Sequence, residues 1–163
     1  RAHQANRADC YGKVASGHRG VIPPSTEEVL PPLGYTQTMA KLFITLASLS
    51  GMLAVVLGAF GAHALKGKLD EYALGVFQTA VHYHFYHSFA LLMVGVIALS
   101  QPQTVMLKSS GWLFVLGILV FSGSLYLLSI TGMRWLGAVT PLGGLAFIGG
   151  WACLAATGRK LLV

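Results

Sequence analysis

Charged side chains are scarce in this chain of 163 residues, at 10% of the total against about 25% in an ordinary soluble domain. Acidic residues are scarcest, with 5 Asp and Glu against 11 Lys and Arg. So few charges cannot cover a water-facing surface, which argues against a soluble globular domain. The sequence also lacks the Cys/His spacings of zinc sites, and its cysteines, Cys10 and Cys153, lie in very different surroundings, so we expect no disulfide framework.

Apolar residues make up 55% of the chain, and the mean hydropathy is +0.67. Lipid must therefore face much of the surface, and the lipid bilayer is the first expected partner. The net charge is +6, but the basic residues stand singly or in pairs at the ends of apolar runs. That pattern is typical of topology determinants and contacts with anionic lipid. It does not form the basic stripe that a row of phosphates needs, so we expect no nucleic-acid partner.

The apolar residues gather in runs long enough to cross a bilayer. As a helix, the uncharged run Leu42–Leu65 would be about 36 Å long, against a hydrocarbon core of about 30 Å. The expected spans are residues 42–65, 72–99, 111–130 and 137–157. The sequence thus predicts an all-α fold, a four-helix transmembrane bundle with short loops.

Residues 1–38 differ in kind from the rest. The run Pro23–Gly34 is rich in proline and the segment shows no apolar periodicity, so we expect a disordered tail. Met39 is followed by Ala40, Lys41 and a long apolar run, as at the start of many membrane proteins. We therefore expect that the native product begins at Met39 and that residues 39–163 form the four-span membrane domain.

The loop charges bear on orientation. An even number of spans places both termini on one side of the membrane. Basic residues beyond the tail fall on that side at Lys41, Lys108, Arg159 and Lys160, and on the other side at Lys66, Lys68 and Arg134. The positive-inside rule therefore favours cytoplasmic termini, weakly if the tail is not counted.

The stretch Gln78–Leu92 concentrates titratable groups beside an apolar run. Histidine in or beside a membrane span is costly and needs a partner, water or a task. At about 100° per residue, His84 and His87 lie within about 60° of each other, while His82 shares another face with Gln78 and Tyr86. His63 ends the first span, close to the loop that leads into the second. We expect His63 to meet one or more of the second-span histidines near one membrane surface.

Several chemistries fit these side chains. His84 and His87, with His63, would suit zinc, copper or haem iron, although no acidic or cysteine ligand joins them. The histidines with Tyr83, Tyr86 and Gln78 would suit a proton relay, but no span contains Asp or Glu. No nucleophile–base spacing indicates an enzyme.

The structural interpretation of these residues is favoured over all of these chemistries. Histidine and tyrosine rings at a helix entrance lie at the level of the lipid headgroups. Trp112, Trp135 and Trp151 are expected to anchor the interface in the same way. Ser122 and Ser124 are expected to be packing groups, and Pro141 to lie in the first turn of the last helix.

Motifs in order along the chain resemble the YgdD-like family. They are GAFGAHAL at residues 58–65, YHFYHSFAL at 83–91, FSGSLY at 121–126 and TPLGG at 140–144. The resemblance, from about Met39 to Lys160, implies a small multi-pass inner-membrane protein of bacteria, with eukaryotic relatives named transmembrane protein 256. Function is unknown in that family, and no catalytic residue or cofactor carries over. The motif positions that we treat as one candidate site are His63, Tyr83, His84, His87, Ser122, Ser124, Thr140 and Pro141.

We expect a small integral membrane protein, not an enzyme, in the bacterial inner membrane. The leading hypothesis is a structural or accessory role, through helix packing with itself as a homo-oligomer or with a larger membrane complex. The alternative is transport or binding of a proton, a metal or a small polar ligand. No cofactor is expected. The ligand-binding candidates are His63, Gln78, His82, Tyr83, His84, Tyr86, His87, Ser122, Ser124, Thr140 and Pro141, with His84 and His87 as weak metal candidates.

Overall fold

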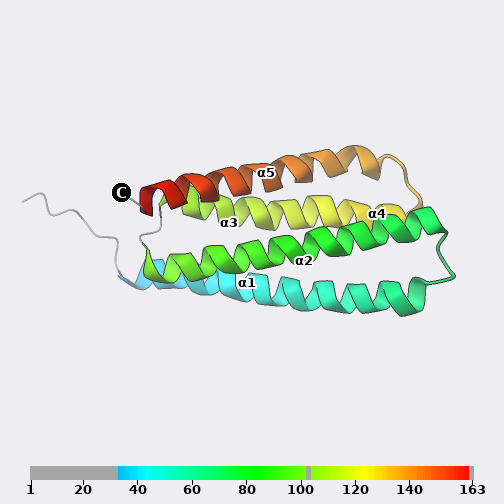
Figure 1. Ribbon diagram of the computed structural model, residues 1–163, viewed down its shortest axis with the longest axis horizontal. Helices are drawn as coiled ribbons and strands as arrows, with labels where there is room; N and C mark the ends of the chain where they lie inside the picture. The colour runs from blue at the N-terminus through cyan, green and yellow to red at the C-terminus, as the bar shows by residue number, and fades with distance from the viewer. Residues whose placement is uncertain (1–32, 102–103, 162–163) are drawn as a thin grey trace, which may run out of the picture. The chain divides into compact units, whose positions relative to one another are not determined.

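The computed structural model describes residues 33–101 and 104–161, all within the compact unit Pro31–Val163 (Figure 1). Its helical elements are α1 (Leu33–Phe60), η1 (Gly61–Leu65), α2 (Glu71–Ser100), α3 (Val105–Gly117), η2 (Ile118–Ser122), α4 (Gly123–Thr131) and α5 (Leu136–Leu161), where η marks a π-helical turn. Within these residues the only β pairing is an isolated bridge between Lys66 and Leu69. The all-α prediction is confirmed.

The described part of the chain contains 4 continuous helical stretches that are long and apolar enough to cross a membrane. They are Gln37–Leu65, Glu71–Ser100, Val105–Thr131 and Leu136–Arg159. The third begins before the expected residue 111, because the Thr104 side chain caps the helix by accepting from the Leu107 N–H. The expected bundle of spans with short loops is thus present.

Helix α1 begins at Leu33, so residues 33–38, which the sequence assigned to a disordered tail, are helical. The last proline of the turn-rich run is Pro32, and no proline follows it until Pro102 to interrupt a helix. The rest of the expected tail, residues 1–32, lies outside the described residues.

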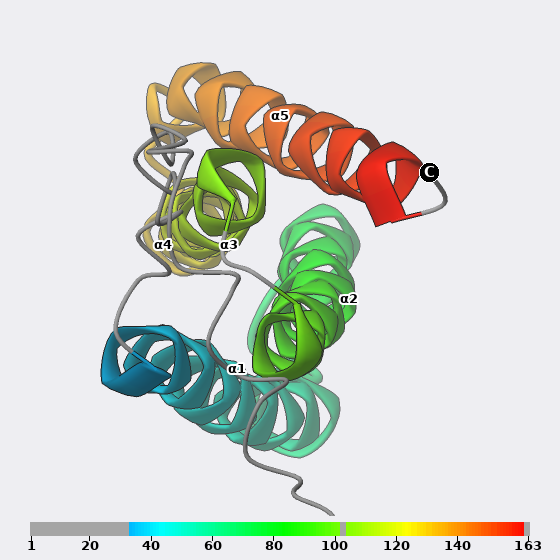
Figure 2. The same cartoon turned by 90° about the vertical axis from the view of Figure 1, so that its left-hand side faces the viewer.

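Helix α2 occupies the centre of the bundle (Figure 2). It packs against α1 on one side and against α3, η2 and α4 on another, while α5 covers α3, η2 and α4. Accordingly, 44% of the residues in an apolar 18-residue segment of α2 are buried within the bundle. The corresponding share for the first span, Gln37–Leu65, is 17%. Polar side chains on α2 therefore face several other helices, whereas α1 has a helix neighbour mainly on one side.

Aromatic and small residues interlock between the helices. Phe43 of α1, Leu91 of α2, Phe114 of α3 and Phe147 of α5 belong to one buried cluster. At Gly143 of α5, an added Cβ would lie only 2.7 Å from the Phe121 Cα, so the two backbones are in direct contact there. Close backbone approach at glycine is the usual way in which membrane helices pack.

Two of the expected spans contain a π-helical turn, η1 in the first span and η2 in the third. The π-helical turn η2 interrupts the third span where it packs against α2 and α5. Each π turn accommodates one residue more than a regular helical turn, a feature frequent at functional sites.

Pro141 lies inside α5, five residues after Leu136, so its expected first-turn position is wrong. Helix α5 begins within one residue of the expected start, so Pro141 lies beyond its first turn and leaves the Gly137 carbonyl without its helical N–H partner.

Candidate functional site

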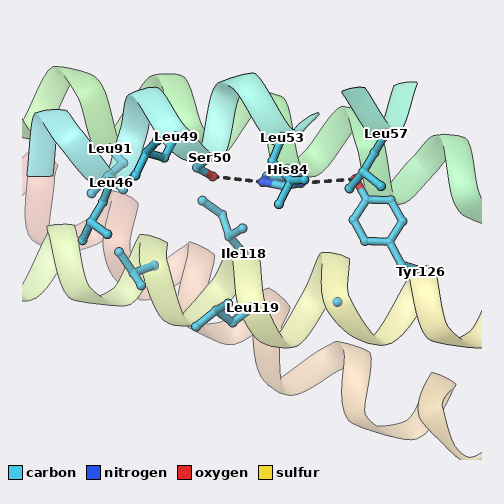
Figure 3. A pocket seen from close by; sticks show the side chains of 12 residues that line it. Leu46, Leu49, Ser50, Leu53, Leu57, His84, Leu91, Ile118, Leu119 and Tyr126 are labelled. Carbon is cyan, nitrogen blue, oxygen red and sulfur yellow. Dashed lines mark hydrogen bonds between the residues drawn. The ribbon is translucent and has the colours of Figure 1, made fainter. Parts of the chain in front are cut away.

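A chain of hydrogen bonds joins α1, α2 and α4 inside the bundle (Figure 3). The Ser50 Oγ lies 2.9 Å from the His84 Nε2, and the Tyr126 Oη lies 3.2 Å from the His84 Nδ1. The Ser50 Oγ also lies 2.6 Å from the Ser88 Oγ, whose hydroxyl donates to the His84 carbonyl at 2.8 Å. We call Ser50, His84, Ser88 and Tyr126 the His84 chain; both ring nitrogens of its histidine have partners.

The direction of every proton in the His84 chain follows from one fixed end. A carbonyl oxygen only accepts hydrogen bonds, so the Ser88 hydroxyl donates to the His84 carbonyl. The Ser88 Oγ must then accept from the Ser50 hydroxyl. Ser50 has then used its own proton and must accept from the His84 Nε2–H. A neutral imidazole has one donor, so its Nδ1 accepts from the Tyr126 hydroxyl. The histidine is neutral in this arrangement, as its apolar surroundings favour.

A cavity of 360 Å³ lies beside the His84 chain, between α1 and the third span. Among the described residues, the polar side chains that line it are those of Ser50, His84 and Tyr126, and apolar side chains such as Leu53 and Leu119 form its walls. These two leucines are 49% and 67% exposed, so the mouth of the cavity opens sideways, toward lipid. The site is therefore an apolar chamber with a small polar floor.

His87 has different partners on the other side of α2. Its Nδ1–H donates to the Tyr83 carbonyl at 2.8 Å, and its Nε2 accepts from the Trp151 indole N–H at 3.3 Å. Its ring stacks on Phe147 with centroids 3.4 Å apart. Both ring nitrogens are occupied and the ring is covered, so His87 ties α2 to α5.

The two buried histidines therefore do not form a common site, although they are close on the helical wheel. Helix α2 is central, so His84 meets α1 and α4 while His87 meets α5. The described residues contain no group of at least 3 His, Cys, Asp or Glu placed to hold a metal ion. A metal bound by His84 and His87 together does not fit this geometry.

The remaining histidine and tyrosine candidates lie at the surface. His63, Gln78 and His82 are exposed, and His82 stacks on Tyr86 with centroids 6.1 Å apart. Tyr83 is 41% exposed and stacks on Phe121. No contact between His63 and another histidine is found among the described residues. The expected meeting of His63 with the second-span histidines is therefore not observed.

The serine and proline candidates lie where the third and fourth spans meet. The Ser124 and Thr140 hydroxyls are 2.8 Å apart and join α4 to α5. Ser122 is fully buried, and its hydroxyl has no hydrogen-bond partner within the described residues. Pro141 is exposed. The family motifs thus form separate links between helices instead of one convergent site.

The depth of these side chains also differs from the expectation. His84 lies about 20 Å along α2 from Glu71, near the middle of the helix and not at a headgroup level near its entrance. Trp151 lies well inside α5 and bonds to His87, so its interpretation as a simple interface anchor is wrong. The polar first half of the expected span 72–99 predicts anchoring at the level of the headgroups. In the structure, that half extends to the middle of α2.

Sequence reasoning missed three members of the His84 chain. Ser50 lies in an apolar run two residues after Ser48, while Ser88 and Tyr126 lie within the motifs at 83–91 and 121–126. The relevant signal was available for one of them: Ser88 follows His84 by one helical turn, so the two share a face. The pairing with Ser50 and Tyr126 depends on how three helices pack and could not be read from spacing.

Fold and site together define a small helical membrane protein with a buried hydrogen-bonded histidine and a lateral cavity. A family model described as "Protein of unknown function (DUF423)" matches residues 57–144. The chain belongs to this family, whose curated members are named UPF0382 membrane proteins. The matched residues include His84 and Tyr126, whereas Ser50 precedes them.

Relatives from several bacteria resemble most of the chain. The UPF0382 membrane protein YwdK of Bacillus subtilis is 46% identical over 122 residues, which cover 75% of this chain and 99% of YwdK. A UPF0382 membrane protein of Staphylococcus haemolyticus is 49% identical over 114 residues, 70% of this chain and 92% of the relative. No solved structure matches the chain. The homologues are thus bacterial membrane proteins whose names give no activity.

Proposed function

We propose that this protein binds a neutral, membrane-soluble amphiphile in the lateral cavity beside the His84 chain. The observation that carries the proposal is the 360 Å³ chamber with Ser50, His84 and Tyr126 on its floor. Ligand sites are usually apolar chambers of about 300–1,000 Å³ with a few placed polar groups. The alternative considered from the sequence, ligand binding at the histidine cluster, is thereby favoured over a purely structural role.

The chemistry of the lining supports a neutral ligand. In the part of the chain that the structure describes, no Lys, Arg, Asp or Glu lines the cavity, so a charged group would enter without a counter-ion. Moving an unpaired charge into an apolar environment is very costly. The polar floor lies near the middle of α2, so a phospholipid headgroup would have to leave the interface to reach it. A ligand with a small neutral polar end and an apolar body meets neither cost.

Catalysis and proton relay are both disfavoured by the direction of the protons. The Ser50–His84 contact has the distance of a nucleophile–base pair. However, the His84 Nε2 carries the proton and gives it to Ser50, so this nitrogen is not poised as a base. The chain also ends on the His84 backbone carbonyl and not at a surface. We therefore propose binding without catalysis.

The proposal is tested by photolabelling in phosphatidylcholine vesicles. Two probes would be used, a dodecanol and a methyl ketone of equal length, each with a diazirine in the chain. We expect saturable labelling of the cavity walls by at least one of them. Gly123 lines the cavity and an added Cβ there meets nothing within 4 Å, so Gly123→Leu should fill the cavity and abolish saturable labelling.

The matched control is Gly75→Leu. Gly75 also lies in a helix with nothing within 4 Å of an added Cβ, but it does not line the cavity. Labelling should persist in this variant. Absence of saturable labelling with both probes, or equal labelling of the Gly123→Leu variant, would contradict the proposed function.

A structural or accessory role is the second candidate, and the one-sided packing of α1 favours it. An added Cβ at Gly51 of α1 meets nothing within 4 Å among the described residues. Gly51 lines an open groove with Phe85 and Phe89 of α2, and Val55 beside it is 61% exposed. Small residues on a helix face permit close approach of another membrane helix. If α1 joins a second copy or a larger membrane complex, Gly51→Leu should lower self-association or co-purification, while Gly75→Leu should not. Equal behaviour of the two variants would exclude this role for α1.

We also propose an inner-membrane location with both termini in the cytoplasm. The support is the charge distribution: basic residues near the termini outnumber Lys66, Lys68 and Arg134, which lie in the loops on the opposite side.

Similarly, we propose that the family relationship extends to the YgdD-like proteins and to the eukaryotic transmembrane protein 256. The support is the set of motifs that the sequence shares with them.

A further inference from the structure

The His84 chain has a property that goes beyond its polarity: every one of its protons is already committed inside the chain. Tyr126 donates to His84, His84 donates to Ser50, Ser50 donates to Ser88, and Ser88 donates to a carbonyl. No proton is left to point into the cavity. The groups on the cavity floor keep unused lone pairs, on the Tyr126 Oη and the Ser50 Oγ.

We infer that the cavity selects a ligand whose polar end donates a hydrogen bond. The ligand class is a long-chain or isoprenoid alcohol, or a phenol or quinol with an apolar tail. A ketone, quinone or ether of the same shape offers only acceptors to a floor that also offers only acceptors. This inference rests on the proposed binding function and specifies its chemistry.

The preference has a clear physical origin. A hydroxyl that leaves water for the bilayer interior loses its hydrogen bonds, and an unmade bond there is costly. The acceptors on the cavity floor restore one such bond. A carbonyl ligand would instead bring lone pairs against lone pairs. One hydrogen bond corresponds to a preference of about five- to tenfold for the alcohol.

The first experiment compares competitors of equal length against the diazirine-bearing dodecanol in phosphatidylcholine vesicles. Unlabelled dodecanol should displace the probe about five- to tenfold more effectively than its methyl ether or the matched methyl ketone. Partition of each compound into the lipid is measured separately, and its displacement of the probe is corrected for this partition. Equal displacement by the three compounds would overturn the inference.

The second experiment removes the preference with Ser50→Ala. The pair of His84 and Tyr126 holds two protons, one on the imidazole and one on the phenol, and one bond between them uses only one proton. Without Ser50, the other proton has lost its acceptor and is available to the cavity, whichever tautomer His84 adopts. The ketone should then bind about as well as the alcohol.

Ser48→Ala is the matched control, because the Ser48 hydroxyl donates to the Ile44 carbonyl of its own helix and does not line the cavity. The alcohol preference should persist in that variant. An unchanged preference in Ser50→Ala would overturn the inference while leaving the proposed function intact. Failure of both photoprobes to label any variant saturably would instead remove the function itself.

Discussion

At the scale of single residues, the buried polar side chains act mainly as ties between helices. Ser110 of α3 donates to the Gly150 carbonyl at 2.9 Å, Ser124 bonds to Thr140, and Trp151 donates to His87. Such bonds in membrane proteins contribute about 0.6 kcal/mol each on average, so they orient helices more than they stabilise them. The His84 chain differs, because it borders a cavity that could admit another molecule.

The adjacent glycines Gly143 and Gly144 give a sharp test of packing at one residue. A Cβ at Gly143 would collide with the Phe121 backbone, which no side-chain rotation can relieve. At Gly144 the nearest atoms belong to the Phe121 ring, 3.8 Å away, an ordinary contact. We expect Gly143→Ala to lower the free energy of unfolding by about 1–3 kcal/mol and Gly144→Ala to leave it nearly unchanged. Unfolding in mixed detergent micelles measures both, and equal stabilities would contradict this packing.

A site residue can be predicted from sequence when its side chain is unusual in its surroundings. It cannot be predicted when its role comes from a hydrogen-bond partner on another helix. His84 and His87 stood out because titratable groups are conspicuous in an apolar run. Ser50 did not, because serine in such a run is common and the role of Ser50 comes from a histidine on another helix. The motif residues do not converge on one site, because a central helix distributes its polar groups to different neighbours.

At the scale of elements, the π-helical turn η2 is the feature that hydropathy could not predict. Length and composition define a span, but one extra residue within it changes neither. That residue matters for the site, because Ile118 and Leu119 in η2 line the cavity and Tyr126 follows in α4. An extra residue in a π turn can be removed without rotating the helical segments on either side.

Deletion of Leu119 tests this interpretation of η2. The span should become a regular helix, keep Tyr126 against His84 and remain folded. Deletion of Phe89, which is similarly exposed but lies in the regular helix α2, should rotate half of that helix by about 100° and disrupt the bundle. Yield and thermal stability in detergent report both results. Equal loss in the two deletions would contradict a removable π turn.

At the scale of the whole molecule, the distribution of burial separates α1 from the other spans. Helices α2, α3, α4 and α5 contact one another, whereas α1 packs almost entirely against α2. Near one end Phe43 of α1 packs against Gly111 and Trp112 of α3, but beside the cavity α1 and the third span both lie against α2 without closing on each other. The number of spans was predictable from apolar length; the opening between them depends on side-chain packing and was not.

The orientation of the whole molecule has a direct test. A reporter that is active only in the cytoplasm, fused after Val163, should be active, because the positive-inside rule places the C-terminal Arg159 and Lys160 there. The same reporter placed in the loop after Gly132, between α4 and α5, should be inactive. The reverse pattern would contradict the proposed orientation.

The central claim is that His84 has a fixed proton arrangement, which ¹⁵N nuclear magnetic resonance of histidine-labelled protein in lipid measures directly. The account predicts opposite neutral tautomers on one helix: His84 protonated on Nε2, and His87 protonated on Nδ1. Assignment would use the single variants His84→Gln and His87→Gln. A His84 ring protonated on Nδ1 alone, or on both nitrogens, would contradict the account.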